Sequence, residues 1–189
     1  MPPRCKSIPT IGPRGLRFRS RLEAKLAFVF DKLGLNWHFE PIDMDGYIPD
    51  FLIDNGDGST LLVEVKGTII FEDLQHYVKK IFESGWKEDF VIIGACAWKE
   101  ELNQTEKACI GIYGSCLSDD QTTDKAFINR SDNRVSISTS LESNAMSYYD
   151  FESIFSDAQN RTQWKKKRTY KKRKTTINPK NFKNMFNLP

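Results

Sequence analysis

The sequence has little of what most metal centres require. Its only two histidines, His38 and His76, are too isolated to build a histidine-based centre, so we expect both at the surface or in satisfied hydrogen bonds. Its four cysteines form no C-x-x-C pair and have no histidine nearby, which argues against a zinc or iron–sulfur site. We interpret Cys96 and Cys109, which fall in apolar stretches, as small core residues of a protein in a reducing compartment.

Long apolar segments are also missing. No run of about 18 apolar residues occurs, and the start M-P-P-R-C-K-S has no apolar signal core. We therefore expect neither membrane insertion nor secretion, and predict a cytoplasmic protein without a membrane partner.

Acidic residues are absent from both ends of the chain. Residues 161–189 hold eleven Lys/Arg and residues 1–21 hold six, with no Asp/Glu in either segment. The remaining eleven Lys/Arg therefore share residues 22–160 with all 25 Asp/Glu, which gives this part a net charge of −14. The chain is thus an acidic body between two basic ends.

The basic C-terminal segment mixes cations with aromatic residues, which suits a phosphate backbone with some stacking on exposed bases. A solvated tail is the usual explanation of such a run, and a nuclear-import signal would compete with it in a eukaryotic setting. A nucleic-acid-binding tail should give affinity with strong salt dependence and little sequence reading. The residues expected to bind nucleic acid here are Trp164, Lys165, Lys166, Lys167, Arg168, Lys171, Lys172, Arg173 and Lys174.

Length and periodicity predict one α/β domain with appendages. The apolar spacing predicts helices over 19–34 and 71–84, and strands over 36–40, 47–53, 61–66, 90–97 and 109–113. The polar stretch 118–146 is predicted to be a long loop or loose hairpin, and Phe151, Ile154, Phe155 and Ala158 indicate a last amphipathic helix. The expected division is a basic arm (1–18), a core (19–117), a polar loop with a helix packing on the core (118–160) and a basic tail (161–189).

Two acids and a lysine fall where two neighbouring strands would bring them together. Asp50 belongs to Y-I-P-D-F-L-I, and Glu64 and Lys66 belong to L-L-V-E-V-K-G after a turn rich in Gly, Asn and Asp. Because side chains alternate along a strand, Glu64 and Lys66 should leave the same face. Each short pattern alone is more often a turn or a solvated sheet face. Together they provide carboxylate oxygens for a hard divalent cation, with a cation beside them for an attacked phosphate.

The residues Pro49, Asp50, Glu64, Val65 and Lys66 resemble the PD-(D/E)XK nuclease superfamily. The resemblance covers about residues 16–115 and implies a restriction-endonuclease-like αβββαβ core, with a mixed central sheet flanked by helices. It also implies Mg²⁺ or Mn²⁺ bound by Asp50, Glu64 and the carbonyl of Val65. Lys66 would orient the attacking water or stabilise the phosphate, and cleaved DNA would carry a 5′-phosphate and a 3′-hydroxyl.

Glu23 fills the place of a glutamate that this family usually supplies from the helix before the strands. In that role it would hold a water or a second metal. It lies beside Leu22 at the border of the apolar helix face, so it would reach a cleft. However, Ser20-Arg21-Leu22-Glu23 is also a capping-box pattern, in which the glutamate binds the backbone at the helix start.

Gln75 and Lys79 flank the apolar stripe of the second predicted helix. Gln75 is a further candidate catalytic residue and Lys79 a candidate DNA contact, and a plain surface position is the alternative for each. Some relatives resembling this family carry Gln followed four residues later by Tyr, where this chain has Lys79.

The main prediction is therefore a Mg²⁺- or Mn²⁺-dependent endonuclease or structure-specific nuclease acting on DNA. A non-catalytic nucleic-acid-binding protein, whose acidic cluster is only a polar sheet face, is the alternative from another class. An RNA-directed nuclease and a homodimer remain open alternatives.

Overall fold

The computed structural model describes residues 10–44, 46–55, 59–117, 122–131 and 134–162. The central sheet contains seven strands in the order β3-β4-β5-β6-β7-β8-β9. Strands β5 and β6 are parallel, and every other neighbouring pair is antiparallel. The chain is therefore an α/β protein with a mixed central sheet. The strands are β3 (Asn36–Phe39), β4 (Phe51–Asp54), β5 (Thr60–Val65), β6 (Asp89–Leu102), β7 (Thr105–Ser115), β8 (Thr123–Ser131) and β9 (Arg134–Ser138).

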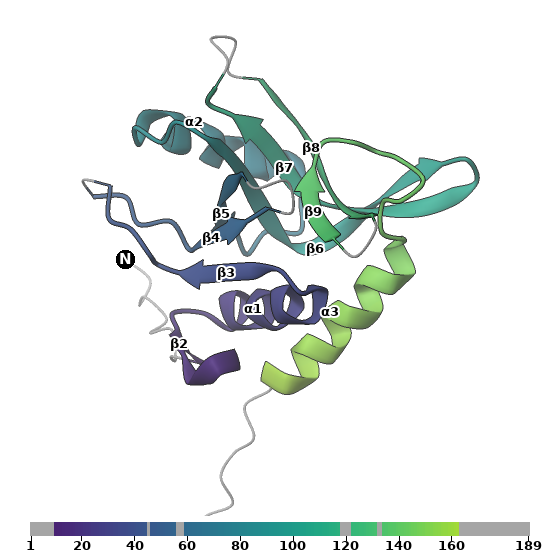
Figure 1. Cartoon of the computed structure of the whole chain (residues 1–189), viewed down its shortest axis with the longest axis horizontal. Coiled ribbons are helices and arrows are strands. Elements are labelled where there is room, and N and C mark those ends of the chain that lie inside the picture. Colours follow the sequence, from purple (N-terminus) through teal and green to yellow (C-terminus); the bar gives the residue numbers. More distant parts are fainter. Residues whose placement is uncertain (1–9, 45, 56–58, 118–121, 132–133, 163–189) are drawn as a thin grey trace, which may run out of the picture.

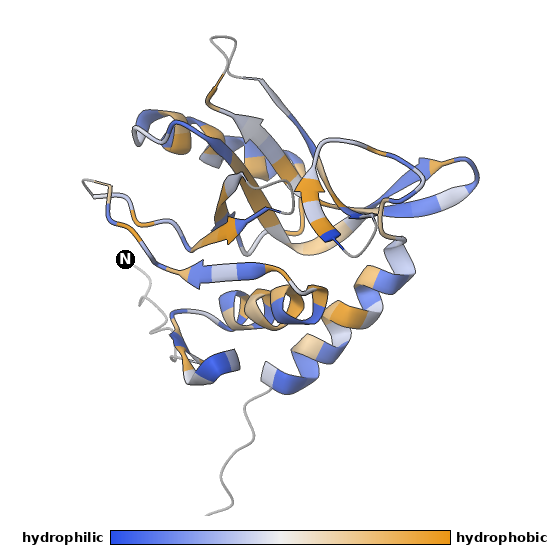
Figure 2. Ribbon diagram, viewed as in Figure 1, coloured by the Kyte–Doolittle hydropathy of each residue, from blue (hydrophilic) through white to orange (hydrophobic). Residues whose placement is uncertain are grey.

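Helices cover both faces of the sheet (Figure 1). Helices α1 (Arg21–Leu33) and α3 (Tyr148–Thr162) lie on one face, and α2 (Gln75–Glu83) lies on the other. Successive side chains of β5 point to opposite faces of the sheet and so belong to two hydrophobic cores. Val63 packs in the core on the α1 and α3 side, and Leu62 packs in the core on the α2 side. The α1 and α3 helices are amphipathic, with polar residues on their outer sides (Figure 2).

Helix α1 has both of its predicted ends. Ser20 caps its start, and Gly34, with a φ of 75°, follows its last residue in the left-handed conformation that glycine adopts readily. The second predicted helix begins as a short 3₁₀ turn, η2 (Glu72–Leu74), and continues as α2. Along the chain, α1, β3, β4, β5, α2 and β6 follow the order predicted from periodicity.

The structure corrects one predicted strand and decides between two alternatives for a later segment. The strand expected from Tyr47 begins only at Phe51, because Pro49 has no N–H for a sheet hydrogen bond and Tyr47 instead bonds to Met44 in a turn. Of the two alternatives for the later polar segment, a long loop or a loose hairpin, the hairpin is correct, and its strands β8 and β9 pair antiparallel as part of the sheet. Its apolar residues Phe127, Ile128 and Ile137 are buried, although polar neighbours mask their alternation in the sequence.

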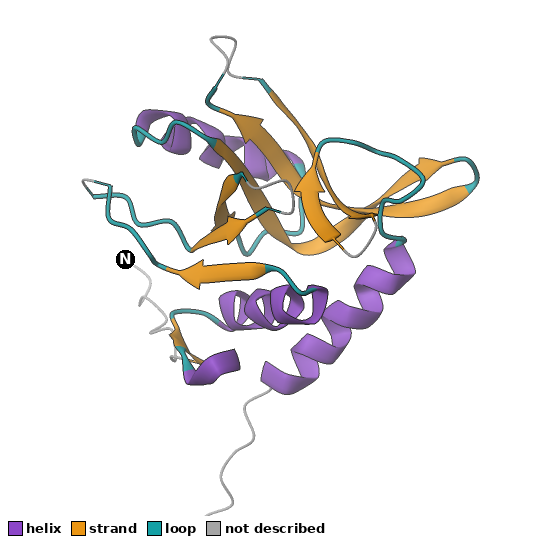
Figure 3. Cartoon of the chain, in the orientation of Figure 1, coloured by secondary structure: helices purple, strands orange, loops and turns teal. Residues whose placement is uncertain are grey.

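The sheet is extended by the β6–β7 hairpin, which projects past the other strands (Figure 3). Residues 10–18 also fold, as β1 (Thr10–Ile11), the 3₁₀ turn η1 (Pro13–Gly15) and β2 (Arg17–Phe18). Phe18 is buried against Phe39 and Phe51, so this part of the expected basic arm belongs to the core. The basic tail beyond residue 162 lies outside the described residues.

Candidate functional site

Asp50, Glu64 and Lys66 meet at one edge of the α2 face. The antiparallel register pairs Phe51 with Val63, so one further step sets Asp50 opposite Glu64. Both carboxylates are buried, with 6% exposure each. Asp50 directly precedes β4 and Lys66 directly follows β5, so the ends of two strands hold the three side chains.

The backbone of β5 positions Asp50. The N–H of Val65 donates to Oδ2 of Asp50 at 2.8 Å, while Oδ1 accepts from the guanidinium of Arg19 at 3.0 Å. Arg19 also forms an ion pair with Glu40. Sequence reasoning missed Arg19, although its place just before the helix that carries Glu23 was a usable signal.

Glu64 lies between two donors. Its Oε1 accepts from the ammonium of Lys66, and its Oε2 accepts from the hydroxyl of Tyr47 at 2.8 Å. Burial and the charge of Glu64 raise the pKa of the Tyr47 hydroxyl, so it stays protonated and remains a donor. Tyr47 was not a candidate from the sequence, because its hydroxyl reaches Glu64 only through the turn before β4.

The surroundings of Asp50 disfavour the charged form of its carboxyl group. Burial, together with the charges of Glu64 and Glu23, raises the pKa of Asp50 to about 6, although the N–H of Val65 and the charge of Lys66 act in the opposite direction. A buried carboxylate with a raised pKa, close to a second carboxylate, gains from a positive charge placed between the two. This property fits a divalent cation.

Glu23 is buried and adopts the capping box. Its Oε2 accepts from the backbone N–H groups of Arg19 at 2.9 Å and Ser20 at 3.3 Å. The same carboxylate is near enough to raise the pKa of Asp50. The capping interpretation is therefore correct, and the capping hydrogen bonds keep Glu23 close to Asp50.

The α2 residues that reach the cluster are Tyr77 and Lys80. The Lys66 ammonium lies 4.8 Å from the centre of the Tyr77 ring, and the Lys80 ammonium lies 4.8 Å from that of Tyr47. Gln75 and Lys79 are exposed, and at about 100° per residue they lie on the helix flank away from Tyr77. Lys79 instead forms an exposed ion pair with Glu83 at 3.5 Å.

Across the described residues, no group of three or more His, Cys, Asp or Glu side chains is arranged as a metal centre. The carboxylates of Asp50 and Glu64 instead pair with Arg19 and Lys66. A divalent ion would have to replace these contacts. The nucleic-acid contacts predicted between Trp164 and Lys174 lie outside the described residues.

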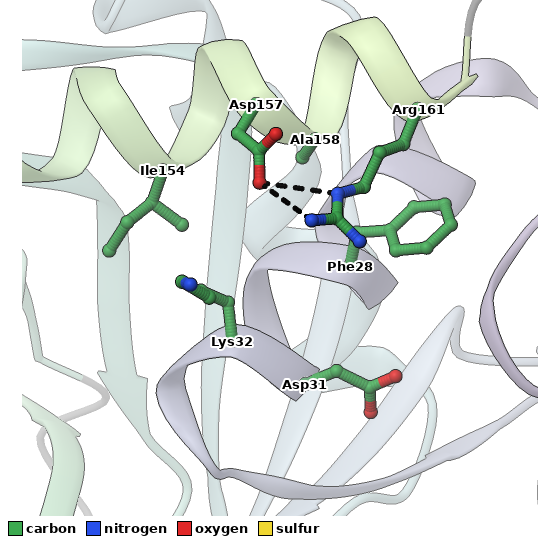
Figure 4. A pocket seen from close by; sticks show the side chains of 7 residues that line it. All are labelled: Phe28, Asp31, Lys32, Ile154, Asp157, Ala158 and Arg161. Carbon is green, nitrogen blue, oxygen red and sulfur yellow. Dashed lines mark hydrogen bonds and ion pairs between the residues drawn. The ribbon is translucent and has the colours of Figure 1, made fainter.

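A hollow of about 350 Å³ lies elsewhere, between α1 and α3 (Figure 4). Asp157 and Arg161 form an ion pair at its border, with two contacts of 3.2 Å. The residues lining it balance acids with bases, so it resembles a gap between two helices more than an ion site. They are Phe28, Asp31, Lys32, Ile154, Asp157, Ala158 and Arg161.

Comparisons with protein-family models, curated proteins and solved structures gave no match to this chain. None of the helices in the described residues is both long enough and apolar enough to cross a membrane.

Proposed function

We propose that the chain is a metal-dependent nuclease of the PD-(D/E)XK type that hydrolyses DNA phosphodiesters to a 5′-phosphate and a 3′-hydroxyl. The observation that carries the proposal is the group of Asp50, Glu64 and Lys66, two buried carboxylates and an ammonium at the ends of adjacent strands. The α-β-β-β-α-β order, with β6 parallel to β5, supports a restriction-endonuclease-like core.

Asp50, Glu64 and the carbonyl of Val65 would hold Mg²⁺ or Mn²⁺, with Glu23 as the outer acid. The donor set fits, because these ions prefer oxygen ligands and two of the acids are buried next to each other. When bound, the ion supplies Lewis-acid activation of water and of the phosphate.

The remaining steps belong to the side chains. Lys66, released from Glu64, would donate to a non-bridging phosphate oxygen and stabilise the charge that develops there. The hydroxyl of Tyr47 would keep Glu64 in place during this exchange, since it binds the other carboxylate oxygen. Arg19, half exposed at the edge of the cluster, would turn from Asp50 towards the incoming phosphate.

A second candidate is a nucleic-acid-binding protein without catalysis. It is favoured by the ion pairs that already satisfy Asp50 and Glu64, an arrangement that a purely structural polar cluster would also show. Its DNA affinity would come from the basic ends of the chain.

Plasmid nicking by the purified full-length protein separates the two candidates. We expect nicking with Mg²⁺ or Mn²⁺, none with chelator, and loss of nicking in Asp50→Ala and Glu64→Ala. Asp54→Asn, which changes an exposed acid at the end of the same strand, is the matched control and should nick normally. Binding in a gel shift without cleavage over several divalent ions would contradict the nuclease and support the second candidate.

A further inference from the structure

Two exposed isoleucines follow Lys66 in the loop after β5. Ile69 and Ile70 are 69% and 53% exposed, in the loop of residues 67–71 between β5 and η2. Single exposed apolar residues are common on protein surfaces. Here, however, two branched apolar side chains are exposed at consecutive positions, only three and four residues after Lys66, in a loop held by hydrogen bonds.

Hydrogen bonds hold the backbone of this loop. The N–H of Ala95 donates to the carbonyl of Thr68 at 2.8 Å, and Nε1 of Trp98 donates to the carbonyl of Ile69 at 3.2 Å. The hydroxyl of Thr68 accepts the N–H of Ile70 at 3.1 Å and lies 3.2 Å from the carboxylate of Asp73. The isoleucines are thus held outwards by an ordered loop.

Packing beneath the loop is equally specific. Phe71 turns inward and meets the Trp98 ring edge to face, with ring centres 5.2 Å apart. Gly94 lets both partners approach, because a Cβ there would lie 2.3 Å from the Trp98 ring and 3.2 Å from the carbonyl of Thr68. The loop therefore sits on β6 through contacts that a side chain at position 94 would break.

The surface next to the loop combines cations with an aromatic ring. The loop begins directly after Lys66, whose ammonium lies 4.8 Å from the centre of the Tyr77 ring on α2. Tyr77 is 37% exposed, with the Lys66 ammonium over its ring. Lys80, which is exposed, adds a second cation. Cations suit a phosphate backbone, and apolar or aromatic side chains suit the face of an unstacked base.

We propose that the substrate is DNA with an unpaired or unstacked nucleotide at the cleavage position, such as a fork between duplex and single strands. This inference rests on the nuclease function proposed above. Ile69 and Ile70 form a wedge against the last base pair, and Tyr77 offers its ring to the released base. Apolar wedges part neighbouring bases at a cost, and that cost is smallest where pairing has already ended.

Binding of matched DNAs to the full-length protein tests this inference without relying on cleavage. The probes are a labelled continuous duplex and a labelled fork of the same sequence, with 2-aminopurine at the first unpaired position. Fluorescence anisotropy is measured in chelator and in Ca²⁺. We expect the fork to bind about tenfold more tightly than the duplex, with a change in 2-aminopurine fluorescence as the base leaves its neighbouring bases and stacks on the Tyr77 ring.

Variants assign the preference to this loop. The double variant Ile69→Ser/Ile70→Ser should reduce the fork preference to about threefold or less and leave duplex affinity unchanged. Tyr77→Ala should lose the 2-aminopurine signal, whereas Tyr77→Phe should retain it. The matched control is Ile11→Ser, which changes an equally exposed isoleucine in β1 (67% exposed) and should behave as wild type.

Equal affinity of the wild-type protein for fork and duplex would overturn this inference, and so would a double variant that keeps the preference. Metal-dependent cleavage of both DNAs at equal rates would retain the nuclease and refute the fork preference. Fork-selective binding lost in the double variant, with no cleavage under any divalent ion, would refute the nuclease and retain the wedge.

Discussion

The guanidinium of Arg19 lies 3.0 Å from Oδ1 of Asp50. The other oxygen of this carboxylate, Oδ2, accepts a hydrogen bond from the backbone N–H of Val65. Arg19 directly precedes Ser20, the N-cap residue of α1, and Asp50 directly precedes β4. The ion pair thus joins two separate elements at the acidic cluster. A cation that binds Asp50 has to compete with this contact.

The competition predicts a gain in metal affinity when Arg19 is replaced. Because the Arg19 side chain is 55% exposed, the ion pair contributes little, and Arg19→Ala should tighten Mn²⁺ binding by about two- to fivefold. Titration calorimetry at low salt measures this change. Arg14→Ala, which removes a surface ion pair with Asp31, is the control and should not alter the affinity. Weaker Mn²⁺ binding in Arg19→Ala would contradict the competition.

Lys66→Ala should separate metal binding from cleavage. Loss of a cation aimed at the developing phosphate charge lowers the rate by about 10² or more, whereas the two acids that bind the metal remain. Single-turnover cleavage measures the rate and calorimetry the Mn²⁺ affinity. Lys32→Ala, an exposed lysine of α1, should cleave normally. Wild-type rates in Lys66→Ala would refute the role assigned to Lys66.

The raised pKa of Asp50 predicts how stability changes with pH. Asp50 has a pKa of about 6 in the folded protein against an ordinary value of 3.8. Between these pH values the folded protein keeps a proton that the unfolded chain has lost, so its free energy of unfolding falls as pH rises. Asp50→Asn has no carboxyl proton to keep, so its free energy of unfolding does not fall in this way. The free energy of unfolding of Asp50→Asn minus that of wild type should therefore rise by about 2–3 kcal/mol from pH 3.5 to pH 7.

Urea unfolding in chelator at several pH values measures this difference. Asp54→Asn, which removes an exposed carboxylate at the end of the same strand, is measured alongside as the control for the loss of one carboxylate. A constant difference for Asp50→Asn over the same range would contradict the raised pKa of Asp50.

Replacement of Asn55 should lower the stability of the fold. Its side-chain amide donates to the carbonyl of Ile137 at 3.1 Å and accepts the N–H of Ile137 at 2.9 Å, so it binds the edge strand β9 as a neighbouring strand would. Asn55→Ala would orphan two buried backbone groups and destabilise the fold by about 2–4 kcal/mol. Thermal and urea unfolding measure it. Asn36→Ala, at an exposed site, should change stability by less than about 0.5 kcal/mol.

The basic tail predicts salt-dependent DNA binding. Replacing Lys171, Lys172, Arg173 and Lys174 by Ala in the full-length chain should weaken binding and reduce the slope of log affinity against log salt by up to about 3–4. Anisotropy titrations at four or more salt concentrations give the slope. The cleavage rate at saturating DNA should not change, and an unchanged slope would show that the tail makes no phosphate contacts.

The sequence by itself determined the local elements of the core. The spacing of apolar residues predicted α1, β5, α2 and β6, and Ser20 and Gly34 predicted the ends of α1, because these signals depend on neighbours within one or two turns. It also predicted that Glu64 and Lys66 share a face, since alternation is a property of the strand itself. Whether this cluster cleaves DNA stays a prediction.

Only the tertiary structure decided which distant residues complete the cluster. Arg19, Tyr47 and Tyr77 carry no local pattern of function, and they meet Asp50, Glu64 and Lys66 because the cap of α1, the turn before β4 and one flank of α2 converge on the same sheet edge. The sequence left open whether the segment of β8 and β9 is a loop or a loose hairpin, for a similar reason. Their stability comes from pairing across the sheet and from Asn55, which sequence periodicity does not record.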